Sequence, residues 1–143
     1  MSDPSEQGSA LLLHESAAMD VRVRRVDSLS VLMVTGEIDM LTGPVFAAFL
    51  DGELELRPRH LVVDLAEVTF FGSHGVRALL AVIERLGRRD NGSTSLHVGL
   101  DGNRFVARTL QITGLTELVD VHPETAALVA ALRAGGDRPA DHA

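Results

Sequence analysis

The sequence contains no cysteine, lysine, tryptophan or tyrosine, and these gaps exclude several kinds of chemistry. Without cysteine there is no disulfide, no catalytic thiol, no zinc–thiolate site and no iron–sulfur cluster. Because all 13 basic residues are arginine, the chain also lacks the lysine of a P-loop or a Schiff-base enzyme. No histidine pair has metal-ligand spacing on a helix, so the sequence predicts neither a metal nor a cofactor.

Aromatic residues are scarce, at 3%, and the formal net charge is −7. Proteins bind single-stranded nucleic acid by stacking bases on aromatic rings, and phosphate backbones require a basic surface. The sequence therefore predicts no nucleic-acid partner. It also lacks a signal-peptide pattern and the run of roughly 20 apolar residues that a membrane span needs. We expect a cytoplasmic protein without a membrane partner.

The length of 143 residues and the 45% hydrophobic content suit one domain with a real core. Both ends are rich in small and polar residues and lack periodicity. We expect a flexible leader over residues 1–18, a folded domain over 19–133 and a flexible tail over 134–143.

Hydrophobic periodicity predicts an α/β fold with the order β-β-α-β-α-β-α-β-α. An opening hairpin followed by alternation indicates a mixed, mostly parallel sheet of four to five strands with about four helices. The expected strands cover 21–24, 30–35, 61–65, 95–100 and an edge strand at 118–121. The expected helices begin after Thr42, near His74, after Asn103 and at Pro123.

The most unusual local sequence is Phe70-Phe71-Gly72-Ser73-His74-Gly75, just after the central strand. Binding sites in open α/β sheets gather beyond the carboxyl ends of the strands. Ser73 fits the N-cap of the following helix, because its hydroxyl can accept from the free amides of the first turn. Considered without other information, this capping role is the favoured one.

A serine hydrolase is the enzyme alternative for the same residue. A nucleophile elbow requires glycine two residues before and two after the serine, and Phe71 occupies the first of these places. His97 and His122 follow in the chain with aspartates nearby, but no spacing singles out a triad. The hydrolase is therefore a remote alternative.

Several motifs in order resemble the STAS domain family, and most of all the bacterial anti-sigma factor antagonists. The resemblance covers about residues 21–132. It rests on Gly36-Glu37-Ile38-Asp39 with Thr42 and Pro44, on Leu61 to Leu65 with Val68 and Phe70, on Phe71 to Val76, and on Leu110 with Thr113-Gly114-Leu115.

The resemblance implies a binding protein and not an enzyme. Such an antagonist binds an anti-sigma factor that is also a serine kinase, and thereby frees a sigma factor. The kinase then phosphorylates the antagonist, and a serine phosphatase resets it. The family's phosphoacceptor corresponds to Ser73. The implied partner-binding residues are Asp39, Gly72, Ser73, His74, Gly75 and Arg77.

The sequence departs from the family pattern at two positions. Gly72 stands where the family usually has aspartate, and His74 where it usually has serine or threonine. The missing carboxylate favours one alternative, a STAS domain that is not phosphorylated and serves as a scaffold or a constitutive antagonist. A further alternative is the STAS subunit of a lipid-transport ATPase complex, which no residue specifically favours.

Overall fold

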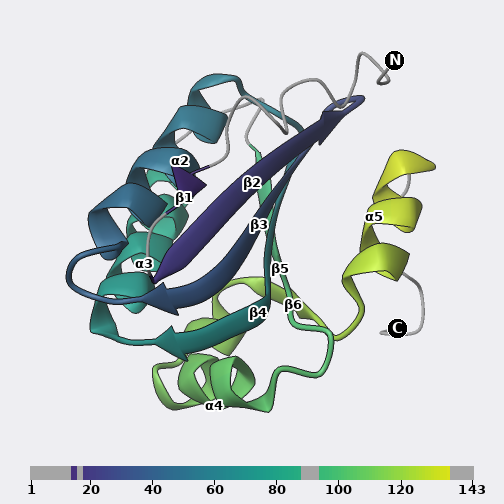
Figure 1. Ribbon diagram of the computed structural model, residues 1–143. Coiled ribbons are helices and arrows are strands. Elements are labelled where there is room, and N and C mark those ends of the chain that lie inside the picture. The colour runs from purple at the N-terminus through teal and green to yellow at the C-terminus, as the bar shows by residue number, and fades with distance from the viewer. Residues whose placement is uncertain (1–13, 16–17, 88–93, 136–143) are drawn as a thin grey trace.

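The computed structural model describes residues 14–15, 18–87 and 94–135 (Figure 1). The strands are β1 (His14–Glu15), β2 (Met19–Val26), β3 (Leu29–Ile38), β4 (His60–Phe71), β5 (Ser95–Gly99) and β6 (Asp120–His122). The helices are α2 (Gly43–Glu55), α3 (Ser73–Gly87), α4 (Arg104–Ile112) and α5 (Thr125–Arg133), with a short 3-10 helix, η2 (Leu115–Glu117). No helix among these residues is both long and apolar enough to cross a bilayer.

The strands form one six-stranded sheet in which each strand lies beside the next one in the chain. β1, β2 and β3 pair antiparallel, whereas β3, β4, β5 and β6 pair parallel. The predicted α/β class and mixed sheet are thus confirmed. β1 is the strand beyond the four to five expected. It lies inside the segment 1–18, and the rest of that segment up to residue 17 lies outside the described residues, as do residues 136–143 of the expected tail.

Helices α2, α3 and α4 cover one face of the sheet, and α5 lies on the other (Figure 1). Parallel strands are almost always joined by right-handed crossovers. Because the three crossovers from β3 to β6 all advance the same way across the sheet, their helices fall on one face. The main core lies there, where Phe46 of α2, Leu79 of α3 and Leu110 of α4 are fully buried. A smaller cluster forms under α5 around Leu128 and Leu132.

Strand β4 is the centre of the molecule. Leu61, Val62 and Val63 each have 0% exposure, and alternate residues belong to the main core and to the cluster under α5. This is the two-sided burial that the continuous apolar run predicted. The strand therefore holds its carboxyl end, and the start of α3, in a fixed position.

Several element boundaries differ from the sequence prediction. The last strand covers Asp120–His122 and not 118–121, because η2 forms first, directly after Gly114 in the left-handed conformation. Helix α5 begins at Thr125 and not at Pro123. The Asn103 cap is confirmed, since its side chain accepts from the Val106 amide at 3.2 Å.

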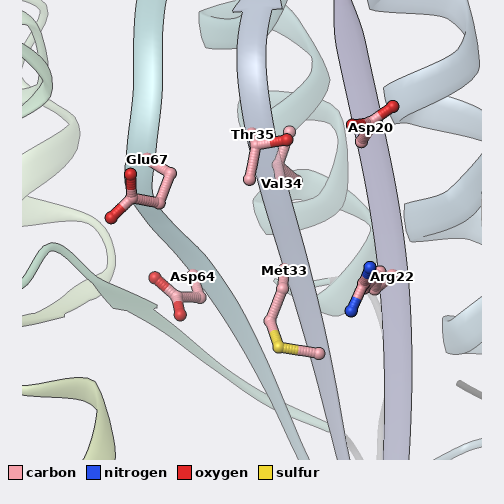
Figure 2. Close-up of a pocket in the computed structure, with 7 residues that line it drawn as sticks. All are labelled: Asp20, Arg22, Met33, Val34, Thr35, Asp64 and Glu67. Atoms are coloured by element: carbon pink, nitrogen blue, oxygen red, sulfur yellow. The ribbon is translucent and has the colours of Figure 1, made fainter. Parts of the chain in front are cut away.

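Part of the sheet face beside α5 is open and forms a hollow of about 310 Å³ (Figure 2). Its charged and polar side chains come from three adjacent strands: Asp20 and Arg22 of β2, Thr35 of β3, and Asp64 and Glu67 of β4. Burial raises the pKa of the Asp64 carboxyl, and the negative charges of Asp101 and Glu67 add to the rise. This half-buried carboxylate therefore opposes folding when it is ionised.

Candidate functional site

The carboxyl ends of β3 and β4 lie side by side and create the candidate site. Ile38 pairs with Phe71, and the Gly72 amide donates to the Ile38 carbonyl at 3.3 Å. This pairing places Asp39, the first residue after β3, next to the β4–α3 junction that carries Ser73. The edge is the one at which open α/β sheets hold their ligands.

Asp39 organises the loop between β3 and α2. Its carboxylate accepts from the amides of Leu41 at 2.9 Å and Thr42 at 3.0 Å. In return, the Asp39 amide donates to the Thr42 hydroxyl at 2.9 Å, and that hydroxyl donates to the Glu37 carbonyl at 2.7 Å. The bond from the Thr42 amide is the main reason that the pKa of Asp39 lies below its ordinary value. The carboxylate is therefore ionised, and its Oδ1 is already engaged within its own loop.

Ser73 is the first residue of α3 and not its cap. The Gly72 carbonyl accepts from the amides of Gly75 at 3.0 Å and Val76 at 3.1 Å, so Gly72 occupies the cap position. The predicted capping role of Ser73 is thus wrong by one residue. Ser73 is exposed, and its hydroxyl makes no hydrogen bond to the residues that the structure describes. A solvent-exposed, uncommitted hydroxyl is open to modification.

Close backbone packing fixes the orientation of this junction. A Cβ atom on Gly43 would lie 2.8 Å from the Cβ of His74, so the start of α2 rests directly on α3. A Cβ on Gly75 would lie 2.6 Å from the buried ring of Phe71. Both glycines are therefore needed for the close approach. The Ser73 junction is packed tightly against α2 and against the Phe71 ring.

Exposed apolar side chains lie on the segments that adjoin the β4–α3 junction, and sequence analysis missed most of them. Met40 and Leu41 follow Asp39 and are 67% and 80% exposed. Phe70 is 45% exposed, and its ring lies 2.9 Å from where a Cβ on Gly72 would be. It pairs with Phe105 of α4, with ring centroids 6.5 Å apart. Met40 and Leu41 lie in the turn between β3 and α2, where no periodic pattern predicts exposure. We call Met40, Leu41, Phe70 and Phe105 the apolar rim.

The structure brings together most of the predicted site residues. Asp39 lies beside the segment Gly72-Ser73-His74-Gly75, through the pairing of Ile38 with Phe71. Arg77 is exposed one turn further along α3. Among the six, Gly75 is buried and supports the site from below, whereas Ser73 and Arg77 face solvent.

The histidines considered for a hydrolase contact an aspartate, another histidine or the backbone. The His97 imidazole contacts Asp120, with Nδ1 and Oδ2 2.8 Å apart, and its Nε2 lies 3.1 Å from Nδ1 of His60. His122 is engaged with the backbone of Glu124. Across the described parts of the chain, no group of three or more histidine or carboxylate side chains could hold a metal ion.

A model of the STAS domain family matches residues 20–128. The chain therefore belongs to the STAS domain family, as its motifs indicated. The match runs from the second residue of β2 through β6, and it includes the β3–α2 loop and the Ser73 junction.

Two proteins that resemble this chain are named as anti-sigma factor antagonists. The chain is 32% identical over 71 residues to the anti-sigma-F factor antagonist RsfB of Mycobacterium tuberculosis. That stretch covers 50% of this chain and 58% of the relative. The crystal structure of an anti-sigma factor antagonist from Mycobacterium paratuberculosis is 29% identical, with a TM-score of 0.71, and the alignment covers 93% of this chain and 99% of that one.

The fold is also that of the anti-sigma factor antagonist SpoIIAA in its unphosphorylated form. The two structures have a TM-score of 0.64 at 16% identity, over 80% of this chain and 96% of SpoIIAA. At that identity the likeness concerns the fold alone.

Proposed function

We propose that this protein is a cytoplasmic anti-sigma factor antagonist whose binding is controlled by phosphorylation of Ser73. It binds an anti-sigma factor that is a serine kinase, which releases a sigma factor. The observation that carries the proposal is the exposed, uncommitted hydroxyl of Ser73 beside the apolar rim. Similarity to RsfB and to the Mycobacterium paratuberculosis antagonist supports the same role.

The apolar rim suits the docking of a partner protein. Exposed apolar side chains that gather at one place mark interaction surfaces, and phenylalanine and methionine are enriched there. Leu41 and Met40 stand on a loop that Asp39 holds in place, so little ordering entropy is lost on binding. The rim and Ser73 would together be covered by the anti-sigma factor.

Phosphorylation would reverse this binding without unfolding the domain. The kinase transfers the γ-phosphoryl group of ATP to the Ser73 Oγ, ADP leaves, and the hydroxyl proton passes to a base of the kinase. The product carries roughly −1.5 to −2 charges at pH 7. A helix N-terminus favours such an anion, so α3 stays folded. A partner surface shaped for a neutral hydroxyl must instead bury a dianion, and a cost of about 3 kcal/mol lowers affinity roughly 100-fold. A serine phosphatase would restore the binding form.

Mass spectrometry tests the assignment of Ser73. Incubation with the anti-sigma factor captured from the native cytoplasm, together with ATP, is expected to add one phosphate, and peptide mapping is expected to place it on Ser73. Ser73→Ala is expected to bind the kinase with or without ATP, and Ser73→Glu to bind it weakly. Ser95→Ala, at an exposed serine of β5, is the control and is expected to behave like the native protein.

Two results would contradict the phosphoswitch. A phosphate on another residue removes Ser73 as the acceptor. Stable binding to the anti-sigma factor with no phosphate added indicates a constitutive antagonist, the alternative that Gly72 favours because it supplies no carboxylate next to Ser73.

A further inference from the structure

Helix α3 carries a cation on the same face as Ser73. Arg77 follows Ser73 by four residues, and α3 is continuous from Ser73 to Gly87. Side chains four residues apart on a helix are neighbours, with Cβ atoms about 5–6 Å apart. Both residues are exposed, so the guanidinium is free to fold back toward the start of the helix.

Among the described residues, no carboxylate pairs with Arg77. The first turn of α3 contains no acidic residue, and Gly72 contributes no side chain. The Asp39 carboxylate, on the neighbouring loop, is held by the Leu41 and Thr42 amides. Arg85 of the same helix behaves differently, since it pairs with Asp51 and Glu55 of α2. Arg77 is therefore a cation without a carboxylate partner among the described residues, four positions along α3 from the proposed phosphoacceptor.

We propose that Arg77 is the intramolecular counter-ion of phosphoserine at position 73. This inference rests on the proposed function, in which Ser73 is the residue that is modified. Arginine pairs with phosphate through two parallel N–H···O bonds, and it does so more strongly than with neutral acceptors. Phosphorylation then changes two groups at once. It adds a dianion at Ser73, and it draws Arg77 away from the surface that meets the partner.

Gly72 fits this arrangement. An aspartate at that position would add a second anion on the residue next to the phosphate, and like charges repel. Because glycine has no carboxylate, position 72 does not compete with the phosphate for the Arg77 guanidinium. The departure from the family pattern at Gly72 and the cation at Arg77 are thus consistent parts of one site.

A protein with genetically encoded phosphoserine at position 73 tests the pairing without any kinase. The second ionisation of phosphoserine ordinarily lies at about pH 6, and a phosphorus NMR titration follows it directly. In the native background, Arg77 is expected to favour the dianion, so the midpoint lies lower than in an Arg77→Gln variant. The expected difference corresponds to a roughly twofold change in proton affinity, as for a strong pair at this spacing.

Three further variants make the result specific. Arg22→Gln, which removes an exposed arginine on the open sheet face, is expected to leave the midpoint unchanged. Arg77→Lys is expected to restore part of the shift, because a lysine keeps the charge but not the two-bond geometry. Arg104→Gln, at the start of α4, is expected to have no effect.

The inference is overturned if the Arg77→Gln and native phosphoproteins titrate alike, or if Arg104→Gln and not Arg77→Gln abolishes the shift. Either failure leaves the proposed function intact, because phosphate transfer to Ser73 is measured separately with the kinase. Conversely, failure of the kinase to modify Ser73 removes the biological role while the titration still reports the pairing.

Discussion

At the residue scale, two helical glycines have opposite surroundings although the sequence does not distinguish them. Gly52 of α2 has open space where a Cβ would be, whereas the same atom on Gly75 of α3 would meet the Phe71 ring at 2.6 Å. Phe71 is 2% exposed and is enclosed by the main core, so its ring cannot move aside. Gly75 is therefore a packing requirement, and Gly52 is not.

Alanine substitution separates the two glycines. Gly75→Ala is expected to lower the free energy of unfolding by about 1–3 kcal/mol, since it overpacks the ring beneath the Ser73 junction. Gly52→Ala is expected to raise it by roughly 0.5–1 kcal/mol, because alanine loses less backbone entropy in a helix. Urea denaturation of both variants checks this. A Gly75→Ala protein as stable as Gly52→Ala would mean that the junction is not tightly packed.

At the element scale, β4 has a weak point at Asp64. The three residues before it are fully buried, and Asp64 follows them and lines the open hollow (Figure 2). Burial raises its pKa, so the folded state binds a proton at Asp64 more tightly than the unfolded chain does. The loss of stability caused by the ionised carboxylate is complete above the raised pKa and disappears below the ordinary value of 3.8.

Asp64→Asn is expected to stabilise the protein at neutral pH. The amide keeps an oxygen that can accept from Ala66, and it removes the charge that Asp101 and Glu67 repel. Because the site is open to water on one side, we expect a gain of at most about 1 kcal/mol, which vanishes as the pH falls toward 3.8. Urea midpoints across that range measure it. A gain that is independent of pH would show that charge is not the cause.

The elements that sequence predicted best are those fixed by long apolar runs. The run at Leu61 to Val63 identified β4, and the Asn103 cap located α4. The predictions that failed concern features that depend on contacts between residues distant in the sequence. Gly72 and not Ser73 caps α3, because its amide is anchored to Ile38 on another strand. The six site residues followed from the family resemblance, but no local pattern indicated that Phe105 would join them.

At the scale of the whole molecule, the proposed site lies apart from the two faces of the sheet. One face of the sheet is packed by three helices, and the other carries α5 and an open polar hollow (Figure 1). The apolar rim lies at neither face but at the edge where β3 and β4 end. The side chains that define the rim are uncharged, and they are large exposed groups at this edge. If a partner docks at this edge, as proposed, we expect apolar burial to supply most of its affinity.

Two exposed leucines allow the role of apolar burial at this edge to be tested, with aspartate introduced at one or the other. Leu41 in the apolar rim is 80% exposed, and Leu56, just after α2, is 57% exposed away from Ser73. Neither has a core role, so aspartate at either position is expected to leave the unfolding midpoint nearly unchanged. Leu41→Asp is expected to weaken binding of the captured anti-sigma factor at least tenfold, about 1.4 kcal/mol, because a charge replaces a buried apolar contact. Leu56→Asp is expected to bind like the native protein.

Calorimetric titration of the unphosphorylated variants with the anti-sigma factor measures both affinities. Equal affinities would place the docking surface away from the β3–α2 loop, even if Ser73 were still phosphorylated. Equal losses would indicate a general effect of added negative charge. A loss confined to Leu41 would mean that the partner covers the same edge on which the phosphate is placed, which is the condition for one serine to control binding in a domain whose fold it does not alter.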